Sequence, residues 1–176
     1  TMMNKVFEII EAKNIFKVNL DKLSILVHPK SYVHAILSFN DGMIKIIAHE
    51  TTMEIPIFNS VYNGEKIKFA SKDINIDKIN NLNFSKVDKK KFPLIKILSM
   101  IPDKISLFET VLVSANDELV SLYLNKKIKY MDISKFLLKT LKLNEFIRYK
   151  KIKPKKISDI IKLDKYVRLK INAKSV

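Results

Sequence analysis

Residues 32–48 read YVHAILSFNDGMIKIIA, and this stretch decides the class of the fold. Two runs rich in aliphatic, β-branched and aromatic residues, 32–39 and 43–48, flank the tripeptide Asn40-Asp41-Gly42. Tight turns favour Asn, Asp and Gly, and glycine adopts the positive φ that such turns often need. The stretch therefore predicts an antiparallel hairpin.

The residues before the hairpin predict one helix and one strand. Apolar residues recur at roughly helical spacing over residues 3–16, which predicts a helix there. The aliphatic run from Leu23 to Val27 stops at His28-Pro29 and predicts a short buried strand.

The residues after the hairpin predict a second helix and then a linker. Thr51 or Thr52 is placed to cap a helix over residues 53–62, and Asn63-Gly64 is typical of a helix end. Residues 65–91 are polar and show little periodicity, which predicts an irregular linker.

The second half of the chain has a helical apolar pattern throughout. We predict helices over 93–100, over 107–124, from a cap at Asp132 or Ser134 to Leu141, and over 158–170. The predicted fold class is α+β: a small mixed or antiparallel sheet with helices, followed by an all-helical C-terminal bundle. The predicted divisions are an α/β domain over 1–64, the linker over 65–91 and a helical domain over 92–176.

The charge of the chain raises nucleic-acid binding as a hypothesis. Its 176 residues include 33 Lys and Arg against 18 Asp and Glu, which gives a formal net charge of +15. Arg148 and Arg168 are the only arginines, although arginine is the better residue for bidentate phosphate contacts. The lysines are scattered and accompany an excess of Ile and Asn, residues that share A/T-rich codons. Genome composition is therefore our preferred explanation, and a nucleic-acid-binding module is the alternative.

Several other classes of site are excluded by composition. The chain has no cysteine, which excludes disulfides, thiolate metal sites and cysteine nucleophiles. Gly42 and Gly64 are its only glycines, so it contains no glycine-rich nucleotide loop. No apolar run is long enough to cross a bilayer.

The start of the first predicted helix is the most suggestive place for chemistry. Asn4 and Lys5 lie where free backbone N–H groups and the helix dipole favour an anion, and Glu8 is spaced to share their face. That face could hold an anionic, hydroxylated ligand and, through Glu8, a hard cation such as Mg²⁺ or Mn²⁺. Spacing alone favours a simpler interpretation, in which Asn4 caps the helix and Lys5 forms a solvated ion pair with Glu8.

Two further groups of polar residues favour structural interpretations. His28 and His34 flank a short turn, but no carboxylate lies at a convincing ligand spacing, so we expect histidines bonded to the backbone at strand ends. The run Asn116-Asp117-Glu118 is expected to form a satisfied polar contact within the bundle. The apolar residues around it, which we expect in the core, are Phe108, Leu112, Leu119 and Leu122.

Seven stretches, in order along the chain, resemble the 1-deoxy-D-xylulose 5-phosphate reductoisomerase family. Met3-Asn4-Lys5-Val6-Phe7-Glu8-Ile9-Ile10-Glu11-Ala12 resembles that family's Met-Asn-Lys-x-x-Glu-x-Ile-Glu-Ala. Leu26 to His34 resembles its His-Pro-Gln-Ser-x-x-His run, with Lys30 in place of Gln. The other matching stretches are Asp41-Gly42, Met53-Glu54-Ile55-Pro56-Ile57 (Glu54 in place of Arg), Phe92-Pro93, Ala115 to Glu118 and Lys127 to Ile133.

The resemblance implies an activity and roles for particular residues. It implies an NADPH-dependent conversion of 1-deoxy-D-xylulose 5-phosphate to 2-C-methyl-D-erythritol 4-phosphate in isoprenoid precursor synthesis, with Mn²⁺ or Mg²⁺, by a homodimer in a bacterial cytoplasm or a plastid stroma. It implies substrate contacts by Asn4 and Lys5, and both metal ligation and substrate contact by Glu8, the catalytic residue. It places Met53 near the nicotinamide and His34 behind the residues that touch the substrate.

The resemblance covers only part of that family's pattern. The NADPH-binding domain, two further metal carboxylates and the phosphate-binding serines are not in this sequence, and residues 64–83 match weakly. We expect Asp-Ser-Ala immediately upstream of Thr1, preceded by a glycine-rich Rossmann segment. The chain by itself is expected to be inactive, and an inactive remnant of the enzyme is a second alternative.

Overall fold

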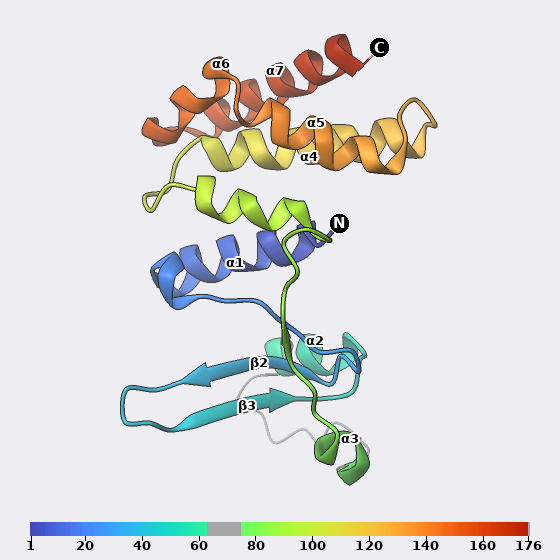
Figure 1. Ribbon diagram of the computed structural model, residues 1–176. Helices are drawn as coiled ribbons and strands as arrows, with labels where there is room; N and C mark the ends of the chain where they lie inside the picture. The colour runs from blue at the N-terminus through green and yellow to red at the C-terminus, as the bar shows by residue number, and fades with distance from the viewer. Residues whose placement is uncertain (63–74, 176) are drawn as a thin grey trace. The chain divides into compact units, whose positions relative to one another are not determined.

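The computed structural model describes residues 1–62 and 75–175, and the fold class is α+β, as predicted (Figure 1). The chain divides into two compact units. The helical unit comprises Thr1–Ser24 and Asp88–Val176, and the hairpin unit comprises Ile25–Val87. The predicted division placed residues 1–64 in one domain. In the structure the first helix instead groups with residues 88–176, because its apolar face packs on the helix over residues 93–100.

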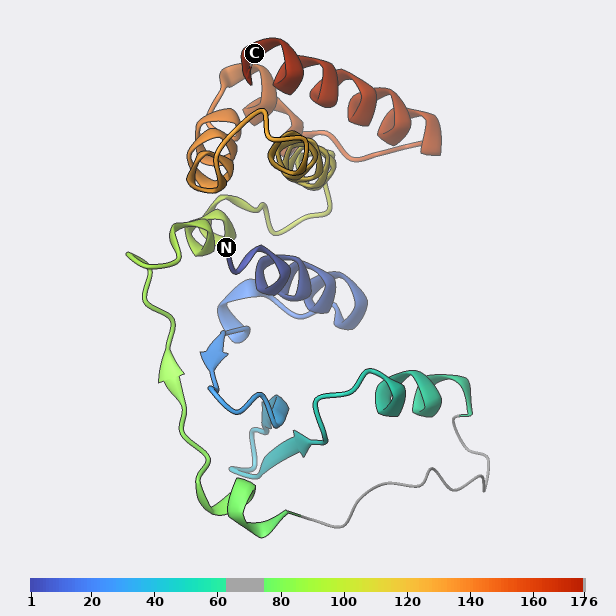
Figure 2. The same cartoon turned by 90° about the vertical axis from the view of Figure 1, so that its right-hand side faces the viewer.

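The helical unit is a stack of helices. In chain order these are α1 (Met3–Phe16), the short 3-10 helix η1 (Leu20–Lys22), η2 (Pro93–Met100), α4 (Phe108–Leu124), α5 (Tyr130–Thr140), α6 (Asn144–Ile147), η3 (Arg148–Lys151) and α7 (Ile157–Ser175). Helix α1 packs on η2, η2 packs on α5, and α4 packs on both α5 and α7 (Figures 1 and 2).

The core of this unit consists of aliphatic and aromatic side chains from several helices. The predicted stripe on α4 is confirmed, because Phe108, Leu112, Leu119 and Leu122 are all buried. Leu137 from α5 and Val167 from α7 are fully buried as well. Burial of this kind contributes about 1.5–3 kcal/mol for each large apolar side chain, so these contacts hold the helices together.

Most predicted helices are present, with shifted ends. Helix α5 begins at Tyr130, because the Asp132 carboxylate accepts from the Lys129 N–H at 2.9 Å and is the third residue of the helix rather than its cap. Residues 93–100 form a 3-10 helix instead of an α-helix. The buried residues Leu94 and Ile97 are three apart, which suits three residues per turn. The short helices α6 and η3 were not predicted.

The predicted hairpin is the centre of the second unit. Strand β2 (Val33–Ser38) pairs antiparallel with β3 (Ile44–Ala48), with Ser38 opposite Ile44. At the turn, Gly42 has a φ of +86°, and the Asp41 carboxylate accepts from the Met43 N–H at 2.9 Å. Glycine was therefore correctly identified as the residue that the turn needs.

The remaining elements of the hairpin unit are short. Helix α2 (Glu54–Val61) follows the hairpin, and its cap residue is Met53, so the prediction of a cap at Thr51 or Thr52 is wrong. The Thr52 hydroxyl nevertheless accepts from the Glu54 N–H at 3.2 Å. Helix α3 (Ile76–Asn80) and strand β4 (Ser85–Lys86) lie in the segment that was predicted as an irregular linker. The predicted helix end at Asn63-Gly64 and residues 65–74 of the linker lie outside the described residues.

The strand predicted over Leu23 to Val27 is shorter and more exposed than expected. Strand β1 contains only Leu26–Val27, and it pairs antiparallel with the two-residue β4. Leu26 is 45% exposed, so the prediction of a buried strand is wrong. A ladder of two residues offers no sheet face large enough to cover the side chain.

Candidate functional site

The first turn of α1 carries the residues that were singled out from the sequence. Met2 adopts a left-handed conformation with a φ of 64°, and the Thr1 hydroxyl accepts from the Met3 N–H at 3.3 Å. The helix therefore begins before Asn4, and the hypothesis that Asn4 is the cap is wrong. Asn4 and Lys5 lie in the first turn, where backbone N–H groups have no partner within the helix.

Lys5 and Glu8 are bound to each other. The Lys5 ammonium nitrogen lies 2.7 Å from Oε2 of Glu8, and the two side chains are 49% and 54% exposed. Asn4 is exposed as well, so the three residues share one accessible face of α1, as their spacing predicted. An exposed ion pair contributes about 0–1 kcal/mol, so a ligand with charged oxygens can replace it at little cost.

The opposite face of α1 fixes the helix in place. Met3, Val6 and Ile10 are buried, and Lys13 continues this stripe with only 6% exposure. Lys13 Nζ donates to the Pro102 carbonyl at 2.7 Å and lies 3.5 Å from Oε1 of Glu109. This buried pair was not predicted. Its signal in the sequence is the position of Lys13, three residues beyond Ile10 on the apolar stripe.

Oxygen chemistry at this face suits a hard cation, but supplies only part of a site. Glu8 offers a carboxylate, the ligand type that Mg²⁺ and Mn²⁺ prefer. Within residues 1–62 and 75–175, no group of three or more His, Cys, Asp or Glu side chains could hold a metal ion. Glu8 therefore fits as one ligand of a set that needs others.

His28 and His34 bond to the backbone, as expected, and so does His49. His34 Nε2 lies 3.2 Å from the His49 carbonyl, and the two imidazole rings stack with centroids 3.6 Å apart. His49 Nδ1 lies 2.6 Å from the Glu50 carbonyl. His28 Nδ1 lies 3.1 Å from the Asn83 carbonyl. These contacts are structural in kind, and the positions of the ring protons follow from the carbonyl acceptors.

Met53 and His34 belong to the hairpin unit, whereas Asn4, Lys5 and Glu8 belong to the helical unit. Met53 is 68% exposed and immediately precedes α2. Within the hairpin unit, Lys78 joins two distant segments. Its ammonium lies 2.8 Å from Oε2 of Glu50 and 5.2 Å from the Tyr32 ring centroid.

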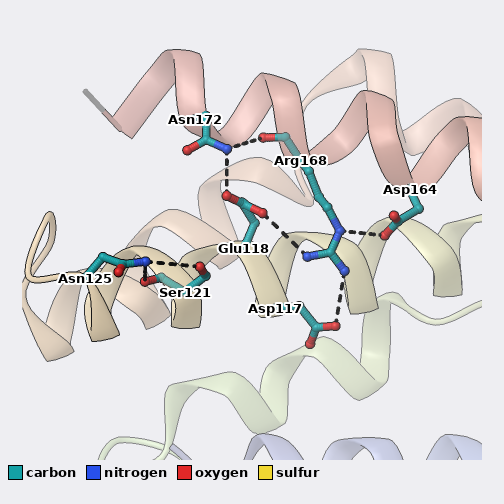
Figure 3. A network of polar contacts seen from close by, with 7 residues as sticks. All are labelled: Asp117, Glu118, Ser121, Asn125, Asp164, Arg168 and Asn172. Atoms are coloured by element: carbon teal, nitrogen blue, oxygen red, sulfur yellow. Dashed lines mark hydrogen bonds and ion pairs between the residues drawn. The ribbon is translucent and has the colours of Figure 1, made fainter.

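Asp117 and Glu118 of the polar run on α4 form polar contacts within the bundle, as predicted, and their partners are on α7 (Figure 3). The Arg168 guanidinium lies 3.4 Å from Asp117, 3.5 Å from Glu118 and 2.9 Å from Asp164. The Asn172 amide donates to Glu118 at 2.6 Å. The network thus links α4 to α7 through charged and amide side chains.

Together these features define an α+β chain with an exposed cationic and carboxylate face on its first helix and a C-terminal helical bundle. Residues 49–170 match the family model described as the DXP reductoisomerase C-terminal domain. The chain belongs to this family.

Relatives and solved structures agree with this assignment. The 1-deoxy-D-xylulose 5-phosphate reductoisomerase of Pelagibacter ubique (strain HTCC1062) is 54% identical over 100% of the chain, which covers 45% of that protein. The structure of the Zymomonas mobilis enzyme in complex with NADPH matches 99% of the chain and 45% of its own, with a TM-score of 0.84 and 28% identity. A DOX-P reductoisomerase in complex with NADPH, fosmidomycin and magnesium matches 99% of the chain and 44% of its own, with a TM-score of 0.88 and 25% identity. The chain thus spans less than half the length of these relatives.

Proposed function

We propose that this chain is the catalytic and C-terminal part of an NADPH-dependent reductoisomerase that converts 1-deoxy-D-xylulose 5-phosphate to 2-C-methyl-D-erythritol 4-phosphate. One observation carries the proposal: α1 presents Asn4, Lys5 and Glu8 together on an exposed face, in a chain that belongs to the DXP reductoisomerase family. The opposite face of the helix is buried, so these three side chains have a fixed support.

Each of the three residues has a role that its chemistry supports. The Lys5 ammonium and the Asn4 amide donate to oxygens of the substrate, and the helix start favours its negative charge. Glu8 would exchange its ion pair with Lys5 for the divalent cation, as one of that cation's ligands. When bound, Mg²⁺ or Mn²⁺ supplies Lewis-acid polarisation of a substrate carbonyl oxygen. Binding of the substrate in this way orients its reacting carbons.

Two residues of the hairpin unit are assigned supporting roles by resemblance. Met53 contacts the nicotinamide of NADPH, and its 68% exposure is consistent with a residue that gains a contact when the cofactor binds. His34 supports the residues that touch the substrate, with its ring held by the stack on His49. Related structures contain NADPH and magnesium, which supports the same cofactors here.

A homodimer is part of the proposal, because the hairpin exposes many apolar side chains. Residues of β2, β3 and their turn that are 39–65% exposed are Ile36, Leu37, Phe39, Met43, Ile44, Ile46 and Ile47. A two-stranded hairpin with open edges is marginal in water, and it gains stability when another surface covers it. The cover is a second copy of the protein, in a bacterial cytoplasm or a plastid stroma.

The test uses the full-length polypeptide that contains this chain. Consumption of NADPH, followed by its absorbance, is expected to require both 1-deoxy-D-xylulose 5-phosphate and Mn²⁺ or Mg²⁺. The 176-residue chain alone is the matched control, and we expect no turnover from it. A folded full-length protein that consumes no NADPH with either metal would favour the inactive remnant.

A further inference from the structure

A cavity of about 390 Å³ lies in the helical unit, beside the start of α7. Its lining comes from the residue before α4, from η3, from the segment that connects η3 to α7, and from the first three turns of α7. This volume lies within the range of about 300–1,000 Å³ that is typical of sites for small molecules. The cavity contains none of the residues assigned to the reductoisomerase site.

One side of the cavity is apolar and firmly held. Its apolar lining is Leu107, Ile152 and Leu163. Leu107 and Leu163 are only 5% and 4% exposed, so they belong to the core of the unit. The Leu107 N–H donates to the Ile152 carbonyl at 2.7 Å, which ties the connecting chain to the start of α4.

Two tyrosine rings, also held in place, extend this apolar lining. The Tyr166 hydroxyl donates to Glu145 at 2.9 Å, and its ring meets Phe146 edge-on at 6.2 Å. The Tyr149 hydroxyl accepts from the Arg148 guanidinium at 3.1 Å. Rings fixed in this way offer a surface for an aromatic or aliphatic group at little cost in side-chain entropy.

Apart from Asp159, the remaining lining is cationic. Lys153, Lys155 and Lys162 line the cavity, and the segment 148–156, RYKKIKPKK, contains no acidic residue. The salt bridges among the described residues use other cations: Lys5, Lys13, Lys78, Arg168 and Lys170. These three lysines thus line one cavity and have no salt-bridge partner among the described residues.

The one carboxylate in the lining is already engaged. Asp159 Oδ2 accepts from the backbone N–H groups of Lys155 and Lys156, both at 3.1 Å. These hydrogen bonds, first that from Lys156 and then that from Lys155, lower the pKa of Asp159. Asp159, the third residue of α7, therefore binds the backbone before the helix, while the charges of Lys156 and Lys162 contribute less to its lowered pKa than these hydrogen bonds do.

We propose that this cavity binds a small organic phosphate, with its apolar body against Leu107, Leu163 and Tyr166 and its phosphate between Lys153, Lys155 and Lys162. The proposal depends on the apolar and the cationic parts of the lining occurring together. A solvated basic surface needs no apolar floor, and an apolar pocket needs no cluster of cations. A site of this kind would bind an effector or a product group separate from the reductoisomerase substrate.

The probe is 1-naphthyl phosphate, titrated into the full-length polypeptide by calorimetry. Saturable binding with one site per chain is expected. Neutral 1-naphthol and inorganic phosphate, titrated separately, are each expected to bind at least about tenfold more weakly, because each lacks one half of the ligand. Inorganic phosphate binding as tightly as the naphthyl ester would overturn the apolar half of the proposal.

The triple variant Lys153→Gln, Lys155→Gln, Lys162→Gln tests the cationic half. It is expected to weaken binding of 1-naphthyl phosphate about tenfold or more, since each charged contact contributes modestly. The matched control is Lys127→Gln, Lys135→Gln, Lys142→Gln, which removes the same charge from exposed positions away from the cavity. The control should stay within about twofold of the unaltered protein. Equal losses in both variants, or no saturable binding at all, would refute the site.

Discussion

The ammonium nitrogen of Lys5 lies 2.7 Å from Oε2 of Glu8, so the proposed substrate-binding cation and the proposed metal ligand are paired with each other. The pair is exposed, and each side chain neutralises the other's charge on the proposed binding face while no ligand is bound. Binding of a phosphorylated substrate and a divalent cation would separate the two residues, and each would exchange one opposite charge for another.

Replacement of Glu8 tests this relationship. In the full-length polypeptide, Glu8→Gln is expected to lower metal-dependent turnover at least about 100-fold, because an amide is a much weaker ligand than a carboxylate for Mg²⁺ or Mn²⁺. The fold should persist, since the Glu8 side chain is 54% exposed. Turnover with saturating metal measures the loss of activity, and far-UV circular dichroism checks that the fold persists.

The control for this variant is Asp21→Asn, which removes one exposed carboxylate from η1 in the same unit. It should leave turnover unchanged. Full activity of Glu8→Gln at every metal concentration would remove Glu8 from the proposed site.

The buried pair of Lys13 and Glu109 provides a prediction for stability. Lys13→Met leaves Glu109, whose side chain is only 14% exposed, without its ammonium partner. We expect a loss of about 2–4 kcal/mol in the free energy of unfolding, measured by urea denaturation of the full-length polypeptide. The double variant Lys13→Met, Glu109→Gln should recover part of that loss, because no uncompensated charge remains buried.

Lys96→Met is the matched control for the buried pair, since Lys96 is exposed on η2. It should change the free energy of unfolding by no more than about 0.5 kcal/mol. A Lys13→Met protein as stable as this control would show that the pair does not hold α1 in place.

The parts of the fold that were predicted correctly depend on local signals. The turn at Asp41-Gly42 and the helix over residues 3–16 each follow from neighbours in the sequence. The pairing of Leu26 with Lys86 and the contact of Lys13 with Glu109, 96 residues away, join distant segments. No periodicity within one chain specifies which distant segment an element will meet.

The candidate site shows the same limit. Spacing placed Asn4, Lys5 and Glu8 on one face of α1, and the structure has them there. The stacking of His34 on His49 depends on the register of β2 and β3, which the sequence leaves open within a residue or two. The acceptors of the histidine rings are backbone carbonyls, and these carry no residue-specific signal.

The network at Arg168 predicts a pH dependence of stability. Burial alone would raise the pKa of Asp164, but hydrogen bonds from Ser114 and Arg168 outweigh it and hold the pKa below its ordinary value of 3.8. The folded protein therefore binds fewer protons than the unfolded chain as the pH falls through this range. The stabilisation is complete above the ordinary pKa and is lost as the pH falls toward the lower, folded value.

Asp164→Asn should accordingly lower the free energy of unfolding at pH 7 by about 1 kcal/mol or less, because the side chain is partly exposed. The difference from the unaltered protein should shrink at pH 3, where the Asp164 carboxylate is partly protonated in the unfolded chain. Urea midpoints at the two pH values measure both quantities. Asp103→Asn, at an exposed position, is the control at pH 7, and a difference that grew at pH 3 would contradict the assignment.

Binding to RNA distinguishes the enzyme from the basic nucleic-acid-binding module. Of the two arginines, Arg168 is already bound to Asp117, Glu118 and Asp164, which leaves the exposed Arg148 as the arginine available to phosphate. We expect weak binding of the full-length polypeptide to a random RNA oligonucleotide, followed by fluorescence polarisation, with a shallow dependence on salt. A protein that contacts 6–10 phosphates loses about 10³–10⁵ in affinity between 50 and 200 mM salt. A slope of that size, together with tight binding at low salt, would favour the nucleic-acid-binding module over the enzyme.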